Sequence, residues 1–139
     1  MHKCEICNRK DATTICIKCR RLICEDCLSP EYLICKECYE FKKAVEENRE
    51  LVLDYAKKMT KICLTHLSSD TCSNCIILRE LVISLLKMVR ELRQEAEREF
   101  FESLIERSAA LERRLKMMLI SILMKQGLAI PEPKNDDSW

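Results

Sequence analysis

The sequence has very few of the residues that interrupt regular structure. Its 139 residues include one glycine and three prolines, and neither type occurs between Glu31 and Gln126. Nothing in that stretch forces a long helix to stop. Aromatic residues make up only 5%, whereas hydrophobic residues reach 47% and charged residues 34%. This composition is typical of a helix-rich globular protein and argues against disordered or fibrous classes.

Three further absences narrow the function. His2 and His66 are the only histidines, so a histidine general base or a Cys/His nucleophile pair has almost no candidates. No run of 18 apolar residues occurs, so we expect no membrane span. The first residues include no apolar stretch of signal-peptide length, so we expect an intracellular, cytoplasmic protein. Because catalytic histidine candidates are so scarce, we do not expect an enzyme.

Cysteine, by contrast, is abundant and regularly spaced. Eleven cysteines and one histidine form six pairs in which two residues separate two soft ligands, an arrangement termed a knuckle: Cys4/Cys7, Cys16/Cys19, Cys24/Cys27, Cys35/Cys38, Cys63/His66 and Cys72/Cys75. Twelve ligands fill three tetrahedral zinc sites with none left over. Disulfides are the alternative, but paired knuckles in a chain with no recognisable signal favour zinc. The sequence therefore predicts three Zn²⁺ per chain.

The first four knuckles are separated by eight, four and seven residues. The short middle gap suits a tight hairpin that directs two knuckles to opposite sides, so alternate knuckles are expected to share an ion. This cross-brace arrangement gives one site of Cys4, Cys7, Cys24 and Cys27 and a second site of Cys16, Cys19, Cys35 and Cys38. Sequential pairing remains the alternative, because spacing alone does not fix connectivity. The apolar pieces TTICI and RLIC are too small to fold such a segment, so metal must supply its core.

A third site is predicted between two helices. Cys63 and His66 lie one turn apart near the end of a predicted helix, and Cys72 and Cys75 lie near the start of the next. A zinc ion held by these four residues would fasten the turn of a helical hairpin. The alternative is a buried helical cysteine and a surface histidine.

Apolar periodicity predicts a helix from about Lys36 to Leu67. Turn residues then precede a second helix that starts near Cys72 and has Gly127 as a plausible C′ residue. Its apolar positions alternate by four and three, with a stutter in the middle: Leu78, Val82, Leu85, Val89, Leu92, Ala96, Phe100, Leu104, Ser108, Leu111, Leu115, Met118 and Ile122. This pattern is compatible with a continuous coiled-coil-like helix or with a break near Ser108.

Two features of this second stretch call for extra partners. The segment LKMMLISILM is apolar nearly all round, which requires a third helix folded back or a dimer seam. Phe100 and Phe101 diverge by about 100° on a helix, so they cannot both face one narrow seam. Either each ring has its own partner or one ring is exposed for binding.

The run CEICNRKDATTICIKCRRLICEDC resembles a B-box zinc finger, the module that precedes a coiled coil in tripartite-motif proteins. The resemblance covers about residues 1–40; Cys35 and Cys38 stand where that family usually has two histidines. The stretch CIKCRRLICEDC also looks like the centre of a FYVE finger, but that family's basic phosphoinositide motif is absent. RING and LIM domains need a two-residue gap between the middle pairs and a histidine ligand, and the first four knuckles have neither.

Basic residues around the knuckles, including Arg20 and Arg21, have two interpretations. They could contact phosphate, or they could partly compensate thiolate charge beside the metal sites. Acidic residues are interleaved with them and stacking aromatic residues are missing, which favours charge compensation. Three filled sites would also make the whole chain acidic, because thiolate charge exceeds the charge of the metal.

The sequence thus predicts a mainly α protein in three parts. Residues 1–40 form a double-zinc module, residues 41–126 form a helical hairpin or three-helix bundle with a zinc-pinned turn at 63–75, and residues 127–139 form a flexible tail. The expected function is that of a non-catalytic adaptor or regulatory protein that binds another protein and self-associates as a homodimer or higher even oligomer through its C-terminal helix. A nucleic-acid- or ribonucleoprotein-associated factor is the alternative, and an enzyme accessory subunit is a third possibility.

Overall fold

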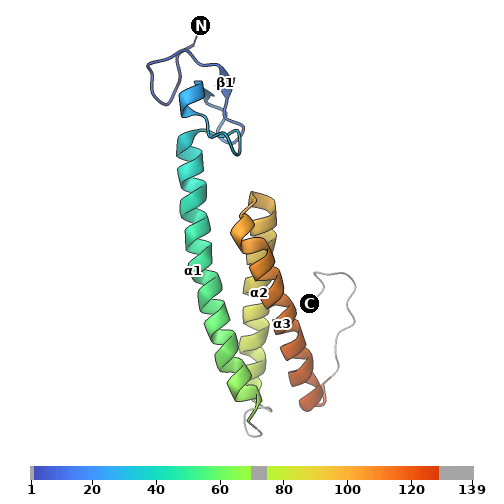
Figure 1. Cartoon of the computed structure of the whole chain (residues 1–139). Helices are drawn as coiled ribbons and strands as arrows, with labels where there is room; N and C mark the ends of the chain where they lie inside the picture. The colour runs from blue at the N-terminus through green and yellow to red at the C-terminus, as the bar shows by residue number, and fades with distance from the viewer. Residues whose placement is uncertain (1, 70–74, 129–139) are drawn as a thin grey trace. The chain divides into compact units, whose positions relative to one another are not determined.

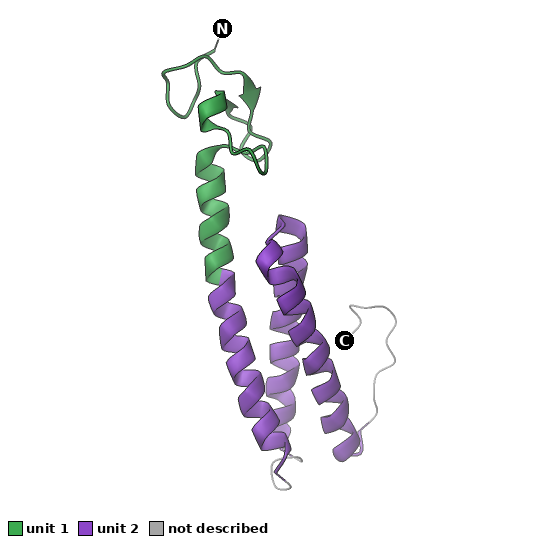
Figure 2. Cartoon of the chain, viewed as in Figure 1, with its two compact units in different colours: residues 1–48 green, residues 49–139 purple. Residues whose placement is uncertain are grey.

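The computed structural model describes residues 2–69 and 75–128. Within these ranges it is mainly helical, with three long helices that follow a small cysteine-rich segment (Figure 1). The chain divides into two compact units, residues 1–48 and 49–139 (Figure 2). The division falls inside helix α1 (Lys36–Leu67), and the predicted boundary after residue 40 lies within the same helix.

The N-terminal unit is built on a minimal β-hairpin. Strands β1 (Thr14–Ile15) and β2 (Leu22–Ile23) pair antiparallel, with Thr14 opposite Ile23. A 3-10 helix, η1 (Glu25–Cys27), follows directly. The buried hydrophobic residues of this unit are five cysteines and only two aliphatic residues, Ile23 and Ile34. So small an apolar core contributes little stability on its own. The stability of the N-terminal unit therefore depends on its cysteines.

Helix α1 has the predicted bounds, Lys36–Leu67. In the helical unit its buried side chains recur every three or four residues: Leu53, Ala56, Thr60, Cys63 and Leu67. This spacing puts them on one face of the helix. The buried Thr60 hydroxyl donates a hydrogen bond to the Ala56 carbonyl oxygen at 2.7 Å, so the one polar side chain on this buried face is satisfied.

The second helical stretch is not continuous. Helix α2 (Ile76–Glu99) and helix α3 (Glu102–Lys125) are separated at Phe100 and Phe101. Phe100 has a left-handed backbone (φ 57°), and the Phe101 amide donates to the Ala96 carbonyl at 2.9 Å, which closes α2 with a Schellman-type turn. The sequence left open a continuous helix or a break near Ser108, and neither alternative is correct: the break lies at Phe100 and Phe101, and Ser108 is buried inside α3. The expected helix start near Cys72 falls outside the described residues.

Helices α2 and α3 lie side by side and antiparallel (Figure 1). The apolar positions predicted on both helices are buried between the elements, including Val82, Val89, Leu115 and Ile122. Of the two alternatives that the sequence left open for the C-terminal apolar segment, a third helix is present, and it folds back along α2. Gly127 (φ 66°) follows α3, and the Leu128 amide donates to the Leu123 carbonyl at 2.8 Å. Gly127 is thus the C′ residue expected from the sequence. Within the described ranges, no helix combines the length and hydropathy needed to cross a membrane.

Candidate metal centres

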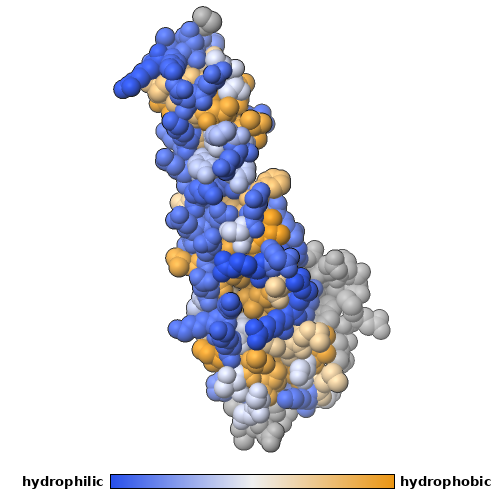
Figure 3. All heavy atoms as spheres, viewed as in Figure 1, coloured by the Kyte–Doolittle hydropathy of each residue, from blue (hydrophilic) through white to orange (hydrophobic). Residues whose placement is uncertain are grey.

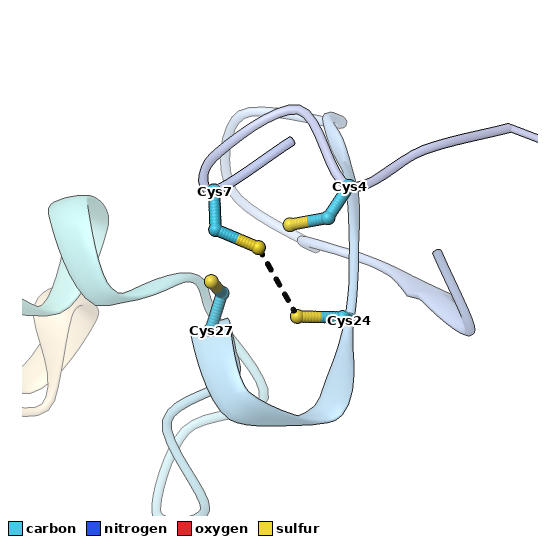
Figure 4. A group of neighbouring side chains, drawn as sticks. All are labelled: Cys4, Cys7, Cys24 and Cys27. Carbon is cyan, nitrogen blue, oxygen red and sulfur yellow. Dashed lines mark hydrogen bonds between the residues drawn. The ribbon is translucent and has the colours of Figure 1, made fainter. Parts of the chain in front are cut away.

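The eight N-terminal cysteines converge in two groups of four. Sulfur atoms of Cys4, Cys7, Cys24 and Cys27 all lie within 4.8 Å of one another, as do those of Cys16, Cys19, Cys35 and Cys38. In Figure 4 the four side chains of the first group point toward a common centre. Each group combines alternate knuckles, the first with the third and the second with the fourth.

The distances between sulfur atoms fit a tetrahedral ion. Four sulfurs at about 2.3 Å from one zinc are separated from each other by about 3.8 Å. The Cys7 and Cys24 sulfurs are 3.8 Å apart, and in the second group the Cys16–Cys38 and Cys19–Cys35 sulfur pairs are each 3.9 Å apart. Disulfide sulfurs lie about 2.0 Å apart, so these cysteines are arranged as ligands rather than as bridges.

The first two knuckles share one backbone geometry. The residue after each second cysteine has a left-handed backbone, Asn8 with φ 56° and Arg20 with φ 69°. The amides of Asn8 and Arg20 donate to the carbonyls of Cys4 and Cys16, both at 2.9 Å. These turns direct both thiols of each pair to the same side. Asparagine tolerates this conformation well, whereas arginine adopts it at some cost in strain.

The other two knuckles come from helical segments. Cys24 and Cys27 flank the turn of η1, and Cys35 and Cys38 stand at the start of α1. The Cys35 amide donates to the Cys16 sulfur at 3.3 Å, and the Cys38 amide donates to the Cys35 sulfur at 3.4 Å. Amide–sulfur hydrogen bonds of this kind stabilise thiolates and orient them for a metal. The start of α1 is therefore fastened to the second cluster.

The electrostatics of each cluster call for a cation. Burial would raise the pKa of the Cys4 and Cys16 thiols, but backbone amides that donate to the sulfurs lower both pKa values to about 6. Burial and the neighbouring cysteines raise the pKa of Cys27 and Cys38 to about 12. Four thiolates cannot coexist so close together without compensation. A divalent ion that accepts four sulfurs supplies it, and zinc is the usual one.

Arg21 adds positive charge to the second cluster. Its Nε donates to the Cys19 sulfur at 3.2 Å, its Nη2 donates to the Cys35 sulfur at 3.5 Å, and Nη2 also lies 2.8 Å from a Glu37 oxygen. Beside the first cluster, Lys10 pairs with Asp26. The Arg21 guanidinium thus partly compensates the thiolate charge of the second cluster, as the simpler interpretation of the basic residues predicts.

The ligands predicted for the third site are not gathered in the same way. Cys63 is buried in α1 and its burial raises its pKa, while His66 is exposed. Cys75 is half-buried at the N-cap of α2. Among the described residues these three do not come within 4.8 Å of one another as a group, and Cys72 lies outside the described residues. A third zinc ion therefore stays a prediction.

Comparisons of the chain with protein-family models, with curated proteins and with solved structures find no match.

Two features of the helical unit had no clear signal in the sequence. One is a buried ion pair between Arg93 of α2 and Glu112 of α3. The other is a groove between α1 and α3 with Lys57, Arg107 and Arg114 along its edge. In the sequence these charged residues lie in charge-dense stretches that are typical of a solvated helix face. Only the packing of the helices shows which of them are buried or line a groove.

Proposed function

We propose that the chain is a non-catalytic adaptor or regulatory protein whose N-terminal unit is folded around two structural zinc ions. The observation that carries the proposal is the convergence of eight cysteines in two groups whose sulfurs have tetrahedral spacing. Structural zinc sites are closed by four protein ligands, whereas catalytic sites keep a position open for water or substrate. Two closed sites fit a role in holding a binding surface in shape.

Exposed apolar side chains supply candidate contact surfaces. On the N-terminal unit Ile15, Ile17 and Leu33 are about half exposed or more. On the helical unit, Leu51, Tyr55 and Ile62 are exposed on α1 at helical spacing. Figure 3 shows hydrophobic atoms exposed among the hydrophilic ones on the visible face. Exposed apolar groups that recur along one element favour a protein-binding role.

We propose that self-association uses the α1 stripe of Leu51, Tyr55 and Ile62 rather than the C-terminal helix. Most of the apolar surface of α3 that motivated a dimer seam, including Leu115 and Ile122, is buried within the chain, and Met117 and Met124 stay exposed. Leu51, Tyr55 and Ile62 follow one another at intervals of four and seven, a spacing typical of helix–helix seams. A homodimer or higher even oligomer remains the expected assembly.

The alternating grouping of the knuckles supports, as part of this proposal, a cross-brace module of the B-box type. In that interpretation the module would precede helices that mediate assembly. The nucleic-acid alternative loses support at Arg21, whose guanidinium contacts two sulfurs and Glu37. A salt titration against generic DNA and RNA separates the two functions, because phosphate-driven binding weakens steeply with salt.

Native mass spectrometry tests the proposal. We expect at least two zinc ions per chain, a third if residues 63–75 also bind, and an even number of chains. The Leu51→Ser/Tyr55→Ser variant should retain all its zinc and become monomeric. An assembly unchanged by this double substitution contradicts the proposed seam, and a zinc-free chain contradicts the proposed function.

A further inference from the structure

Helices α1 and α3 leave a small groove on the surface of the helical unit. Its floor consists of Leu53 and Leu111, which are 2% and 7% exposed. Its volume is about 230 Å³, and its lining residues are Leu53, Lys57, Arg107, Ala110, Leu111 and Arg114. Sites for drug-sized molecules usually have about 300–1,000 Å³. The groove is therefore suited to a single apolar side chain rather than to a small-molecule ligand.

The edge of the groove is positively charged. Lys57 extends from α1, and Arg107 and Arg114 extend from α3. Arg107 pairs with Asp54 at 3.0 Å. Lys57 and Arg114 are exposed and have no hydrogen bond or ion pair with another described residue. Three cations against one carboxylate give the groove a net positive field.

We propose that this groove is the docking site for an acidic segment of a partner protein. One apolar side chain of that segment contacts Leu53 and Leu111, and carboxylates on either side of it pair with Lys57, Arg107 and Arg114. The inference deepens the proposed adaptor function and rests on it. Nucleic acid fits less well, because a phosphate backbone offers nothing apolar for the floor, and bases need stacking partners that the lining lacks.

Charged neighbours of the lining residues provide matched controls. Lys58 follows Lys57 on α1, and Arg113 precedes Arg114 on α3; both controls are exposed and lie outside the groove. The Lys57→Glu/Arg114→Glu variant reverses two charges at the groove, and the Lys58→Glu/Arg113→Glu variant reverses two charges beside it. Both double variants change the net charge equally, so a general electrostatic effect appears in both.

The probe is a short fluorescein-labelled peptide with leucine at helical spacing among glutamates, and binding is followed by fluorescence anisotropy. We expect the groove variant to bind at least about tenfold more weakly than the native chain and the control variant to stay within about threefold. A peptide with serine in place of leucine, and one with lysine in place of glutamate, should each bind at least about tenfold more weakly. Circular dichroism establishes that both variants are folded.

Three results would overturn the proposal: no binding of the acidic peptide by the native chain, equal weakening in the groove and control variants, or displacement of the peptide by single-stranded DNA. Sedimentation of the groove variant tests a second copy of the chain as the occupant, and loss of the oligomer would assign the groove to self-association and overturn the proposal. Zinc content and assembly of the native chain are measured on the same samples. If both are as expected and the peptide does not bind, only this inference fails.

Discussion

Arg93 on α2 and Glu112 on α3 form a buried ion pair that joins the two helices. The Arg93 Nε lies 3.1 Å and 2.9 Å from the two carboxylate oxygens of Glu112, and the Arg93 and Glu112 side chains are only 14% and 5% exposed. The Nε of Arg90 lies 3.8 Å from the same carboxylate. A buried carboxylate shared by two guanidinium groups defines the register of α2 against α3, because sliding either helix would leave charge buried without compensation.

Replacing Glu112 with alanine should therefore destabilise the helical unit strongly. The Arg90 and Arg93 guanidinium groups would stay largely buried without this carboxylate, although Arg93 keeps its 3.2 Å pair with Glu97, and breaking a buried ion pair costs about 3–5 kcal/mol in comparable sites. Urea denaturation followed by circular dichroism measures the loss. The control is Glu106→Ala, because Glu106 pairs with Arg113 on the surface and its side chain is 83% exposed. It should cost under about 1 kcal/mol, and equal losses for the two variants would contradict the role of Glu112.

Phe100 should be replaceable by glycine with a gain in stability. Its left-handed backbone (φ 57°) costs a non-glycine residue about 1–2 kcal/mol, and its side chain is 62% exposed. Glycine removes that strain but raises the entropy of the unfolded chain, so the expected net gain is about 0.5–1 kcal/mol. Thermal unfolding measures this change in stability. A lower midpoint for Phe100→Gly than for the native chain would contradict the assignment of backbone strain to Phe100.

Replacing the neighbouring Phe101 with alanine should lower the stability of the helical unit. Phe101 is 3% exposed, so Phe101→Ala removes a buried ring and should cost about 3–5 kcal/mol. Together the two variants test whether the break between α2 and α3 exists because one ring is buried and the other is left outside.

Much of this architecture could be predicted from local sequence, and the rest depends on packing. The bounds of α1 follow from apolar periodicity, and Gly127 marks the end of α3 because glycine is the residue best suited to a left-handed C′ position. The spacing of the knuckles predicted the two groups of four cysteines that the structure gathers, and it also predicted a third site at residues 63–75 for which the described residues form no such group. The break at Phe100 could not be found in the same way, since phenylalanine is an unusual residue in a left-handed turn and the burial of Phe101 is a tertiary effect. The groove edged by Lys57 and Arg114 arises only when α1 and α3 come together.

Arg21→Ala should weaken zinc binding at the second cluster alone. The Arg21 guanidinium donates to the Cys19 and Cys35 sulfurs, and losing an outer hydrogen bond to a metal ligand typically lowers metal affinity about 10–100-fold. Competition with a chromophoric chelator measures the two sites separately. Arg9→Ala is the control, because Arg9 is exposed and follows the first knuckle. The prediction fails if both variants release zinc alike.

Cys24→Ser should unfold the N-terminal unit and leave most of the helical signal. Cys24 belongs to the first cluster, and the small apolar core around Ile23 and Ile34 cannot replace the lost metal. Hydrogen exchange should show lost protection for residues 2–35 and retained protection in α2 and α3. Retention of both zinc ions and of the protection in residues 2–35 would contradict the assignment of Cys24 as a ligand.

X-ray absorption at the zinc edge tests the central claim most directly. The sample is the full chain, natively purified, with Cys63 and His66 replaced by alanine. In this variant the zinc signal comes from the two N-terminal clusters. We predict two zinc ions per chain, each surrounded by four sulfurs at about 2.3 Å. An absence of zinc, or a shell of nitrogen and oxygen ligands around it, would contradict the claim that these eight cysteines fold the N-terminal unit around metal.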